Sequence, residues 1–181
     1  NNKNDLGSGA NQSGGLTELG RKVIKYLDQN DIIIDLAHMN EQTFQDTLEI
    51  INNPPLISHG NARFYSDLPR NYSDTQLKAV ADRNGMICVF MSPRFVRQGD
   101  SVTLGDLIAQ IEYIVDLVGI DHVGLGSDFG GITANQMIPG LEKVTDLQNI
   151  VEALQAHGYT EQEIEKITHK NMEQYIKSRL C

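Results

Sequence analysis

The chain has 181 residues, of which 40% are hydrophobic and 22% charged, with no tryptophan, a composition typical of a folded globular domain. The formal net charge is −9 at pH 7, which argues against nucleic acid or an anionic membrane surface as a partner, because both require clustered Lys and Arg. No apolar run approaches the roughly 18 residues of a membrane-spanning helix. Cys88 lies in an apolar segment and Cys181 is the last residue, so no disulfide framework is indicated.

The first part of the chain predicts a loop, a helix and a buried strand. Residues 1–15 are rich in Asn, Gly and Ser, which is typical of a loop. Thr17 is a candidate N-cap for a helix to about Gln29, because apolar residues recur at helical spacing after it. Ile32–His38 begins with three β-branched residues and is apolar on both faces, as expected for a parallel strand covered by helices.

Two apolar segments end in histidine. The predicted strand Ile32–His38 carries Asp35 and His38 at its carboxyl end, and Pro55–His59 repeats the pattern 21 residues later. This spacing leaves room for one helix and two loops between parallel neighbours. Either histidine alone would merely cap its strand by hydrogen bonding, but two imidazoles side by side favour a zinc-type ion. Asp35 is interpreted as a hydrogen-bond acceptor at the strand end rather than as a metal ligand.

The rest of the chain alternates between strands and helices. Strands are expected at Met86–Phe90 and His122–Asp128, and helices at about 41–51, from Ser73 or Asp74 as N-cap to Asn84-Gly85, and at about 104–118, 147–157 and 160–179. Thr160 and Glu163 are expected to form a capping box at the start of the last helix. Together with the first two strands, this order predicts an α/β fold with four parallel strand–helix units and a terminal helix. Four such units are half of a (β/α)₈ TIM-like barrel, which needs about 250 residues, although a small open sheet is an alternative. No glycine-rich phosphate-binding motif indicates a nucleotide site.

A series of short motifs is spread along nearly the whole chain. The set comprises Gly15-Leu16-Thr17, Asp35-Leu36-Ala37-His38, Ser58-His59, Asn61-Ala62-Arg63, Pro69-Arg70-Asn71, Gly119–Gly124, Gly126–Phe129 and Gly158–Glu161. In this respect the chain resembles the membrane (renal) dipeptidase family of zinc peptidases. The resemblance implies a (β/α)₈ barrel with a two-zinc site, in which residues 1–181 form one partial domain, the C-terminal half. It also implies that the N-terminal half lies outside this sequence.

The resemblance also implies roles for four residues. His38 and His59 look like the two imidazole ligands of one Zn²⁺, and Arg70 looks like the residue that grips the carboxylate of a dipeptide substrate. Asp128 looks like the carboxylate that handles protons beside the bridging water and meets the free amine of the substrate. The family's His-x-Asp pair, bridging Glu and further His have no counterpart here. We therefore expect the sequence to begin just after the last of them.

Two departures from the family pattern keep other functions open. The family has Asp-Phe-Asp-Gly at its last strand end, where this chain has Asp128-Phe129-Gly130-Gly131, and its aromatic-rich third strand end is replaced by Phe90–Arg94. The favoured function is a zinc-dependent dipeptidase that acts on dipeptides with a free C-terminal carboxylate and is inactive as this chain alone. The alternative is a non-hydrolytic or binding-only relative on the same barrel. If the barrel is incomplete, its exposed sheet edges could pair with a second copy of the chain, so a homodimer is a further alternative.

Overall fold

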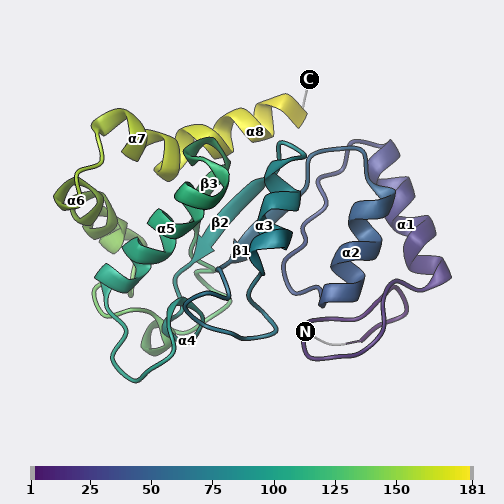
Figure 1. The fold of residues 1–181 in the computed structure, drawn as a ribbon, viewed down its shortest axis with the longest axis horizontal. Coiled ribbons are helices and arrows are strands. Elements are labelled where there is room, and N and C mark those ends of the chain that lie inside the picture. The colour runs from purple at the N-terminus through teal and green to yellow at the C-terminus, as the bar shows by residue number, and fades with distance from the viewer. Residues whose placement is uncertain (1–2, 180–181) are drawn as a thin grey trace.

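A computed structural model describes residues 3–179 and has a parallel sheet at its centre (Figure 1). The three strands β1 (Leu56–Gly60), β2 (Met86–Phe90) and β3 (Val123–Gly126) lie in the order β1-β2-β3. Both pairs are parallel, as the alternation of strands and helices predicts. The carboxyl ends of all three strands therefore meet at one edge of the sheet.

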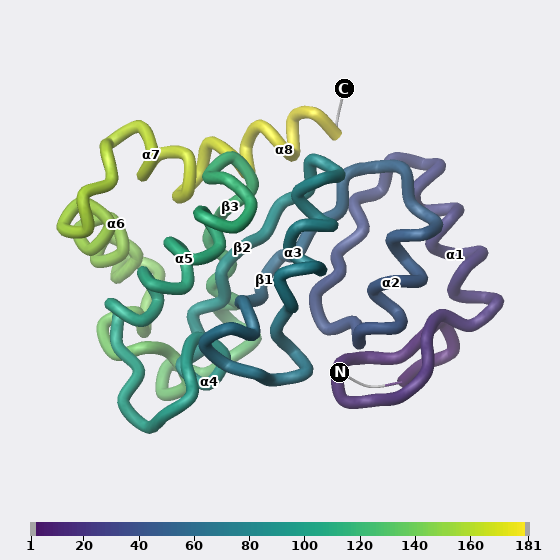
Figure 2. Tube along the Cα trace, in the orientation of Figure 1, coloured from purple at the N-terminus to yellow at the C-terminus, as the bar shows by residue number. Residues whose placement is uncertain are grey.

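Helices follow or precede each strand, and α1 and α2 lie beside each other at one end of the molecule, with α6 at the other end (Figure 2). The α-helices are α1 (Glu18–Gln29), α2 (Glu41–Ile50), α3 (Asp74–Ala81), α4 (Pro93–Val96), α5 (Leu104–Val118), α6 (Gln148–Ala156), α7 (Glu161–Glu165) and α8 (Asn171–Arg179). Single 3₁₀ turns occur at Ile120–His122, Ala134–Gln136 and Val144–Leu147. In the part of the chain from residue 3 to residue 179, no helix is long and apolar enough to cross a bilayer.

Side-chain caps begin the helices where the sequence predicts them. Thr17 accepts a hydrogen bond from the backbone N–H of Gly20, and Ser73 forms a capping box with Gln76. Thr160 and Glu163 form the predicted box at the start of α7. Each cap satisfies a backbone N–H that has no partner within its own helix. These predicted helix starts are confirmed.

The structure corrects the prediction of a strand at Ile32–His38. This segment forms only a single parallel bridge, between Asp35 and Leu56. Two backbone hydrogen bonds hold it to β1, from Leu36 N to Leu56 O at 2.7 Å and from Leu56 N to Ile34 O at 3.1 Å. The segment pairs on one side only and then turns at His38, whose φ is 69°. The four predicted strand–helix units therefore appear as three strands and a bridge. The segment still brings Asp35 and His38 to the edge where β1 ends.

The structure also corrects the prediction of one regular terminal helix over 160–179. A π-helical turn at Lys166–Lys170 separates α7 from α8. Ile167 within this turn is buried against β3. A π turn inserts one residue into the helical spacing, which shifts the buried face of the helix. Asn171 follows it and donates from Nδ2 to the carbonyl oxygens of Ile120 and Val123, at 2.7 and 2.9 Å. The extra residue thus places Ile167 against β3 and Asn171 within hydrogen-bonding distance of the segment that leads into β3.

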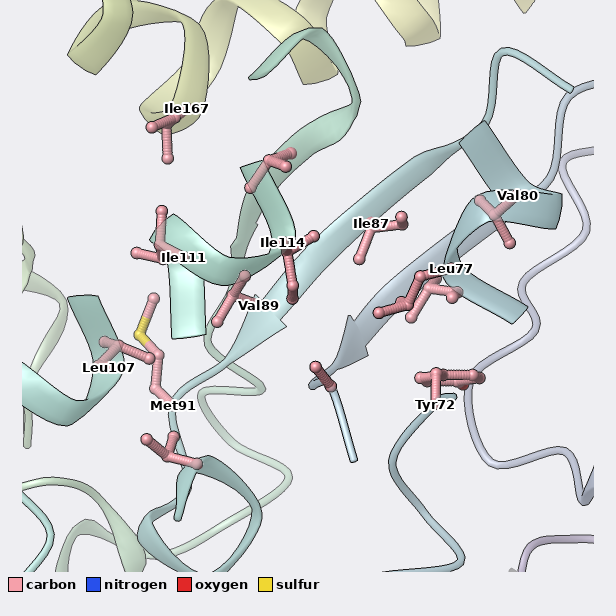
Figure 3. Close-up of a cluster of buried hydrophobic side chains, with 14 of the residues drawn as sticks. Tyr72, Leu77, Val80, Ile87, Val89, Met91, Leu107, Ile111, Ile114 and Ile167 are labelled. Atoms are coloured by element: carbon pink, nitrogen blue, oxygen red, sulfur yellow. The ribbon is translucent and has the colours of Figure 1, made fainter. Parts of the chain in front are cut away.

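The hydrophobic core lies between β2 and the two helices α3 and α5 (Figure 3). The strand β2 is buried along its whole length, as expected for a central parallel strand. The fully buried side chains shown there include Leu77, Val80, Ile87, Val89, Leu107, Ile111 and Ile114. Cys88 lies in β2 as a buried free thiol, and Cys181 lies outside the described residues.

Gly126 at the end of β3 explains how the strand ends approach one another. A Cβ at Gly126 would lie 2.2 Å from Ser58 O and 3.0 Å from His59 Cα of β1. Because β1 and β3 lie on opposite sides of β2, this close approach between them means that the sheet is strongly curved. Any side chain at Gly126 would push β1 away, so glycine here permits this close packing.

Candidate functional site

The four predicted site residues come together at the carboxyl edge of the sheet. His38 follows the bridged segment, His59 lies in β1, Arg70 lies in the loop after β1, and Asp128 follows β3. His59 is the centre of the group, because its Nε2 lies 3.0 Å from His38 Nε2, 2.7 Å from Arg70 Nη2 and 3.8 Å from Asp128 Oδ2. In parallel α/β folds this edge is where ligands bind.

Two of these residues have a left-handed backbone. The φ angles are 69° at His38 and 56° at Asp128, a region that residues other than glycine rarely adopt. Hydrogen bonds hold both turns, since His38 O accepts from Ala10 N at 2.8 Å and Asp128 O accepts from Gly131 N at 2.9 Å. Such strained positions concentrate at functional sites, where the strain places a side chain that a relaxed backbone would direct elsewhere.

Both imidazoles are held in the neutral form. Burial, together with the nearby Arg70 charge, lowers the pKa of His38 to about 4. Burial and the same guanidinium also lower the pKa of His59. Because a neutral imidazole has a nitrogen lone pair and an imidazolium does not, both side chains are suited to bind a metal near pH 7.

The ring of His59 is fixed by the residues on either side of it. Its Nδ1 lies 2.9 Å from Ser58 Oγ, and the ring packs edge-on against Phe90 of β2 at 5.2 Å between centroids. Its side chain is 13% exposed. Sequence reasoning singled out neither Ser58 nor Phe90 for this role. Their positions at the strand ends beside His59 are the only signal that could have found them.

Arg70 is buried, with 7% of the residue exposed. The loop that carries it is anchored by Asn71, whose Nδ2 donates to Ser66 O and Phe95 O, both at 2.8 Å. While Nη2 meets His59, the buried Nη1 has no hydrogen-bond partner among residues 3–179. A buried guanidinium with an unused donor is typical of a site that receives an anionic oxygen.

The two histidines fit part of a zinc site. Two nitrogen ligands of a tetrahedral zinc, each at about 2.0–2.1 Å from the ion, would lie about 3.3 Å apart. The observed separation of 3.0 Å between the Nε2 atoms of His38 and His59 is close to that value. Within the described part of the chain, no group of three or more His, Cys, Asp or Glu side chains is placed to hold a metal ion. The site therefore offers two ligands, fewer than the three protein ligands that a catalytic zinc usually has.

Asp35, which the sequence predicts as a hydrogen-bond acceptor, and two further histidines have structural contacts. Asp35 accepts hydrogen bonds at the strand end, as expected. His122 Nδ1 lies 3.0 Å from Gly85 O, and His157 Nδ1 lies 3.0 Å from Glu112 Oε1. Neither histidine contacts the group around His59.

Residues 2–178 match the family model of the membrane dipeptidases, peptidase family M19. The chain belongs to the membrane dipeptidase family. This match confirms the resemblance seen in the motifs from Gly15 to Glu161. The parallel α/β fold agrees with this membership.

Two sequence relatives and one solved structure show which proteins this member of the membrane dipeptidase family is similar to. It is 35% identical to an "uncharacterized protein in pqqA 5'region" of Klebsiella pneumoniae, over 97% of this chain and 68% of that protein. It is 28% identical to dipeptidase tcpJ of Claviceps purpurea, over 87% of this chain and 37% of that protein. It superposes with a TM-score of 0.88 and 29% identity on a metallopeptidase from Rhodobacter sphaeroides, liganded with a phosphinate mimic of the dipeptide L-Ala-D-Ala. That match covers 95% of this chain and 52% of the metallopeptidase.

Proposed function

We propose that the complete protein is a zinc-dependent dipeptidase that hydrolyses dipeptides with a free C-terminal carboxylate. The observation that carries the proposal is the convergence of two neutral histidines and a buried arginine at one strand edge, in a chain that belongs to the membrane dipeptidase family. The chain spans about half the length of the metallopeptidase that it superposes on. The activity is therefore proposed for the whole protein and not for these residues alone.

His38 and His59 would hold one zinc ion through their Nε2 atoms. A bound zinc supplies Lewis-acid activation of the scissile carbonyl and of the attacking water. The second zinc of a binuclear site, the bridging carboxylate and further ligands would come from outside residues 1–181. In this proposal the chain is one partial domain, the C-terminal half of the (β/α)₈ barrel, and needs the N-terminal half to complete the site.

Arg70 would bind the carboxylate of the dipeptide. Its guanidinium is fixed by burial and by its loop, and its Nη1 still has a hydrogen bond to donate. Because the binding group stands next to the two histidines, it would accept a carboxylate only one residue away from the bond that is cleaved. This short distance would exclude longer peptides.

Asp128 would move protons during the reaction. Its Oδ2 lies 3.8 Å from His59 Nε2, and its side chain is 29% exposed, so it can meet both water and substrate. The carboxylate would accept a proton from the attacking water and deliver it to the nitrogen of the leaving amine. Its negative charge would also bind the ammonium group of the substrate.

The alternative is a non-hydrolytic or binding-only member of the family. Gly130 stands where the family has a second acid, and its φ of 90° is one that side chains rarely adopt. An aspartate at position 130 would therefore be strained in the turn that follows Asp128 here. This difference is the specific observation that favours a relative with altered chemistry.

The test is hydrolysis of a dipeptide panel by the complete protein, with zinc removed by a chelator and then restored. The panel should contain L-Ala-L-Ala, L-Ala-D-Ala, their C-terminal amides and a tripeptide. We expect zinc-dependent turnover of the free dipeptides and little turnover of the amides or the tripeptide. Binding of dipeptides without turnover would support the non-hydrolytic alternative instead.

A further inference from the structure

The Asp35 carboxylate connects the two segments that carry the histidines. Its Oδ1 accepts backbone hydrogen bonds from Ala37 N and Ser58 N, both at 3.0 Å. Its Oδ2 accepts a hydrogen bond from Ser58 Oγ at 2.5 Å. One carboxylate therefore holds the residue before His38 and the residue before His59. Neither contact belongs to the regular hydrogen bonds of the sheet.

The direction of these hydrogen bonds determines the tautomer of His59. An ionised carboxylate can only accept, so the single proton of the Ser58 hydroxyl is donated to Asp35. Ser58 Oγ also lies 2.9 Å from His59 Nδ1 and has only lone pairs left to offer there. The His59 Nδ1 must therefore carry a proton and donate it to Ser58. In a neutral imidazole this leaves Nε2 with its lone pair.

Arg70 supports the same assignment independently. A guanidinium has N–H donors and no acceptor, and Arg70 Nη2 lies 2.7 Å from His59 Nε2. That contact is a hydrogen bond only if Nε2 is unprotonated. The bonds at both ring nitrogens of His59 thus agree on one tautomer.

We propose that Asp35 is a positioning residue of the metal site, which acts through Ser58 to keep the proton of His59 on Nδ1 and to present the Nε2 lone pair to the zinc ion. The inference deepens the proposed function, on which it rests for the identity of the ion. Histidine ligands of metals are commonly oriented in this way by an acceptor at the second ring nitrogen. Here the acceptor is a serine hydroxyl, and its orientation depends on the carboxylate behind it. The bonds from Ala37 and Ser58 to the same carboxylate also hold the turn of His38 beside β1.

Asp35→Asn is the decisive variant, because it is nearly isosteric but reverses the hydrogen bonds. The amide oxygen of asparagine can still accept from the two backbone N–H groups, while its NH₂ group donates to Ser58 Oγ. The Ser58 proton then turns towards His59 Nδ1, and that contact is satisfied only if the ring proton moves to Nε2. Since Arg70 Nη2 still requires an unprotonated Nε2, no single tautomer satisfies both contacts in this variant. A protonated Nε2 cannot ligate a metal without a change of tautomer.

The measurements are the tautomer of His59 and the affinity for Zn²⁺ in the complete protein. Long-range ¹H–¹⁵N NMR of the metal-free, histidine-labelled protein reports which ring nitrogen is protonated, and His59→Gln assigns the signals. Titration of Zn²⁺ against a chromophoric chelator reports affinity. For Asp35→Asn we expect loss of the single Nδ1-protonated tautomer, with Nε2-protonated His59 now present, and Zn²⁺ affinity about 10–100-fold weaker. Ser58→Ala should give a mixture of tautomers and a smaller loss of affinity.

Asp106→Asn is the matched control. Its carboxylate also accepts from a backbone N–H and a hydroxyl, those of Thr103, both at 2.8 Å, but at the start of α5. It should change neither the tautomer of His59 nor the affinity for Zn²⁺. An unchanged tautomer and unchanged affinity in Asp35→Asn would overturn the proposal. If that variant does not fold, the same result in Ser58→Ala would overturn it.

These readouts separate this inference from the proposed function. A protein that hydrolyses no dipeptide but shows the expected tautomer and affinity changes would still support the role of Asp35. A protein that hydrolyses dipeptides while Asp35→Asn behaves like the parent protein would overturn only that role.

Discussion

Arg70 Nη2 lies 2.7 Å from His59 Nε2, so the proposed carboxylate-binding group and a proposed metal ligand are in direct contact. The two residues belong to β1 and to the loop that follows it, and burial of Arg70 fixes their relative position. A carboxylate bound by Arg70 would therefore stand close to the metal site, which limits the length of the substrate.

We expect Arg70→Lys in the complete protein to raise KM more than it lowers kcat. Lysine keeps the charge but lacks the planar pair of donors, so the carboxylate is held more weakly in both the ground state and the transition state. Loss of one charge-assisted hydrogen bond costs about 1.5–3 kcal/mol, which corresponds to roughly 10–100-fold in KM. Steady-state kinetics on a dipeptide checks this, with Arg94→Lys at an exposed position as control. An unchanged KM would show that Arg70 does not bind the carboxylate.

We expect Asp128→Asn to abolish most turnover and to leave the metal content unchanged. Asparagine tolerates the left-handed φ of 56° at this position, so the turn should survive. Loss of a positioned acid–base group typically lowers kcat by about 10²–10⁴. The check is kcat and metal stoichiometry on one preparation, with Asp121→Asn, an exposed ion-pair residue, as control. Loss of metal together with activity would make Asp128 a ligand, and full activity would leave it a structural residue.

We expect residues 1–181 alone to have no dipeptidase activity. The described residues provide two imidazoles to a metal, whereas a catalytic zinc usually has three protein ligands. The purified chain should be assayed on the dipeptide panel with added zinc. Turnover that disappears in His38→Ala would refute this expectation.

The metal-free protein should lose stability as the pH falls below neutrality. His38 has a pKa of about 4 in the folded protein, against 6.5 for the unperturbed group, because burial disfavours the imidazolium. Above pH 6.5 the residue is neutral in both states and makes no difference. Between pH 6.5 and about 4 the unfolded chain takes up a proton that the folded chain does not, so unfolding becomes more favourable. Urea unfolding across this range should show a weaker pH dependence in His38→Gln than in His157→Gln. Equal slopes would contradict the assignment.

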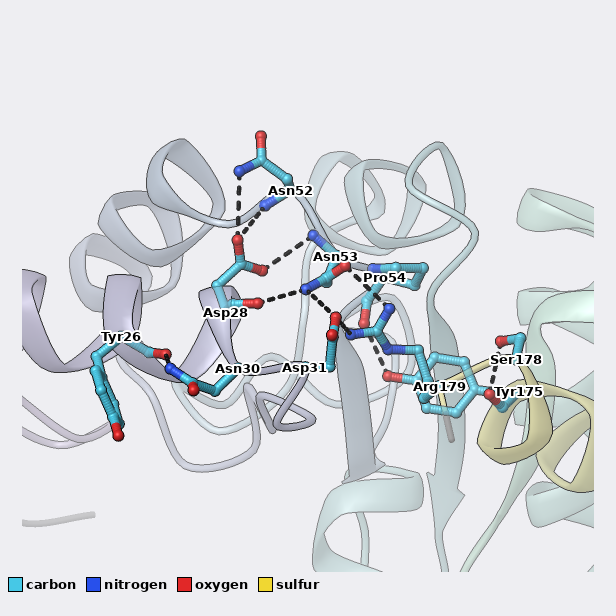
Figure 4. A network of polar contacts seen from close by, with 10 residues as sticks. All are labelled: Tyr26, Asp28, Asn30, Asp31, Asn52, Asn53, Pro54, Tyr175, Ser178 and Arg179. Atoms are coloured by element: carbon cyan, nitrogen blue, oxygen red, sulfur yellow. Dashed lines mark hydrogen bonds and ion pairs between the residues drawn. The ribbon is translucent and has the colours of Figure 1, made fainter. Parts of the chain in front are cut away.

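Asp28 should contribute substantially to stability. It is 5% exposed at the end of α1, and it accepts hydrogen bonds from Asn52 N and Asn53 N, both at 3.0 Å (Figure 4). Asp28→Ala leaves these backbone donors without a partner, and we expect the free energy of unfolding to fall by about 2–3 kcal/mol. Asp31→Asn tolerates the left-handed φ of 54° at this position and removes the charge of a neighbouring carboxylate that is 71% exposed and contacts Arg179 at 3.5 Å. It should cost less than about 0.5 kcal/mol. Denaturant unfolding compares the two, and similar losses would count against the role of Asp28.

Local sequence patterns predicted the elements and the identity of the site residues. The caps at Thr17, Ser73 and Thr160 and the run of apolar residues over Leu104–Val118 specify their helices, because capping and helical spacing act within a few residues. The histidines at the ends of two apolar segments indicated a shared edge, since parallel strands finish on the same side. The motif order indicated the family, which the match to residues 2–178 confirms.

Only the tertiary structure decided how these parts meet. Ile32–His38 reads as a strand, yet it makes only one bridge, because a strand forms by repeated pairing with a neighbouring strand and β-branched residues alone do not supply that pairing. The π turn at Lys166–Lys170 likewise depends on packing against β3, which lies far from it in the sequence. The hydrogen bond from Ser58 to Asp35 joins residues 23 positions apart, and its direction, like that of the contact between Ser58 and His59, follows from distances that no local pattern encodes. The sequence determined which groups are present at the site, and the fold decided which atom of each group faces the others.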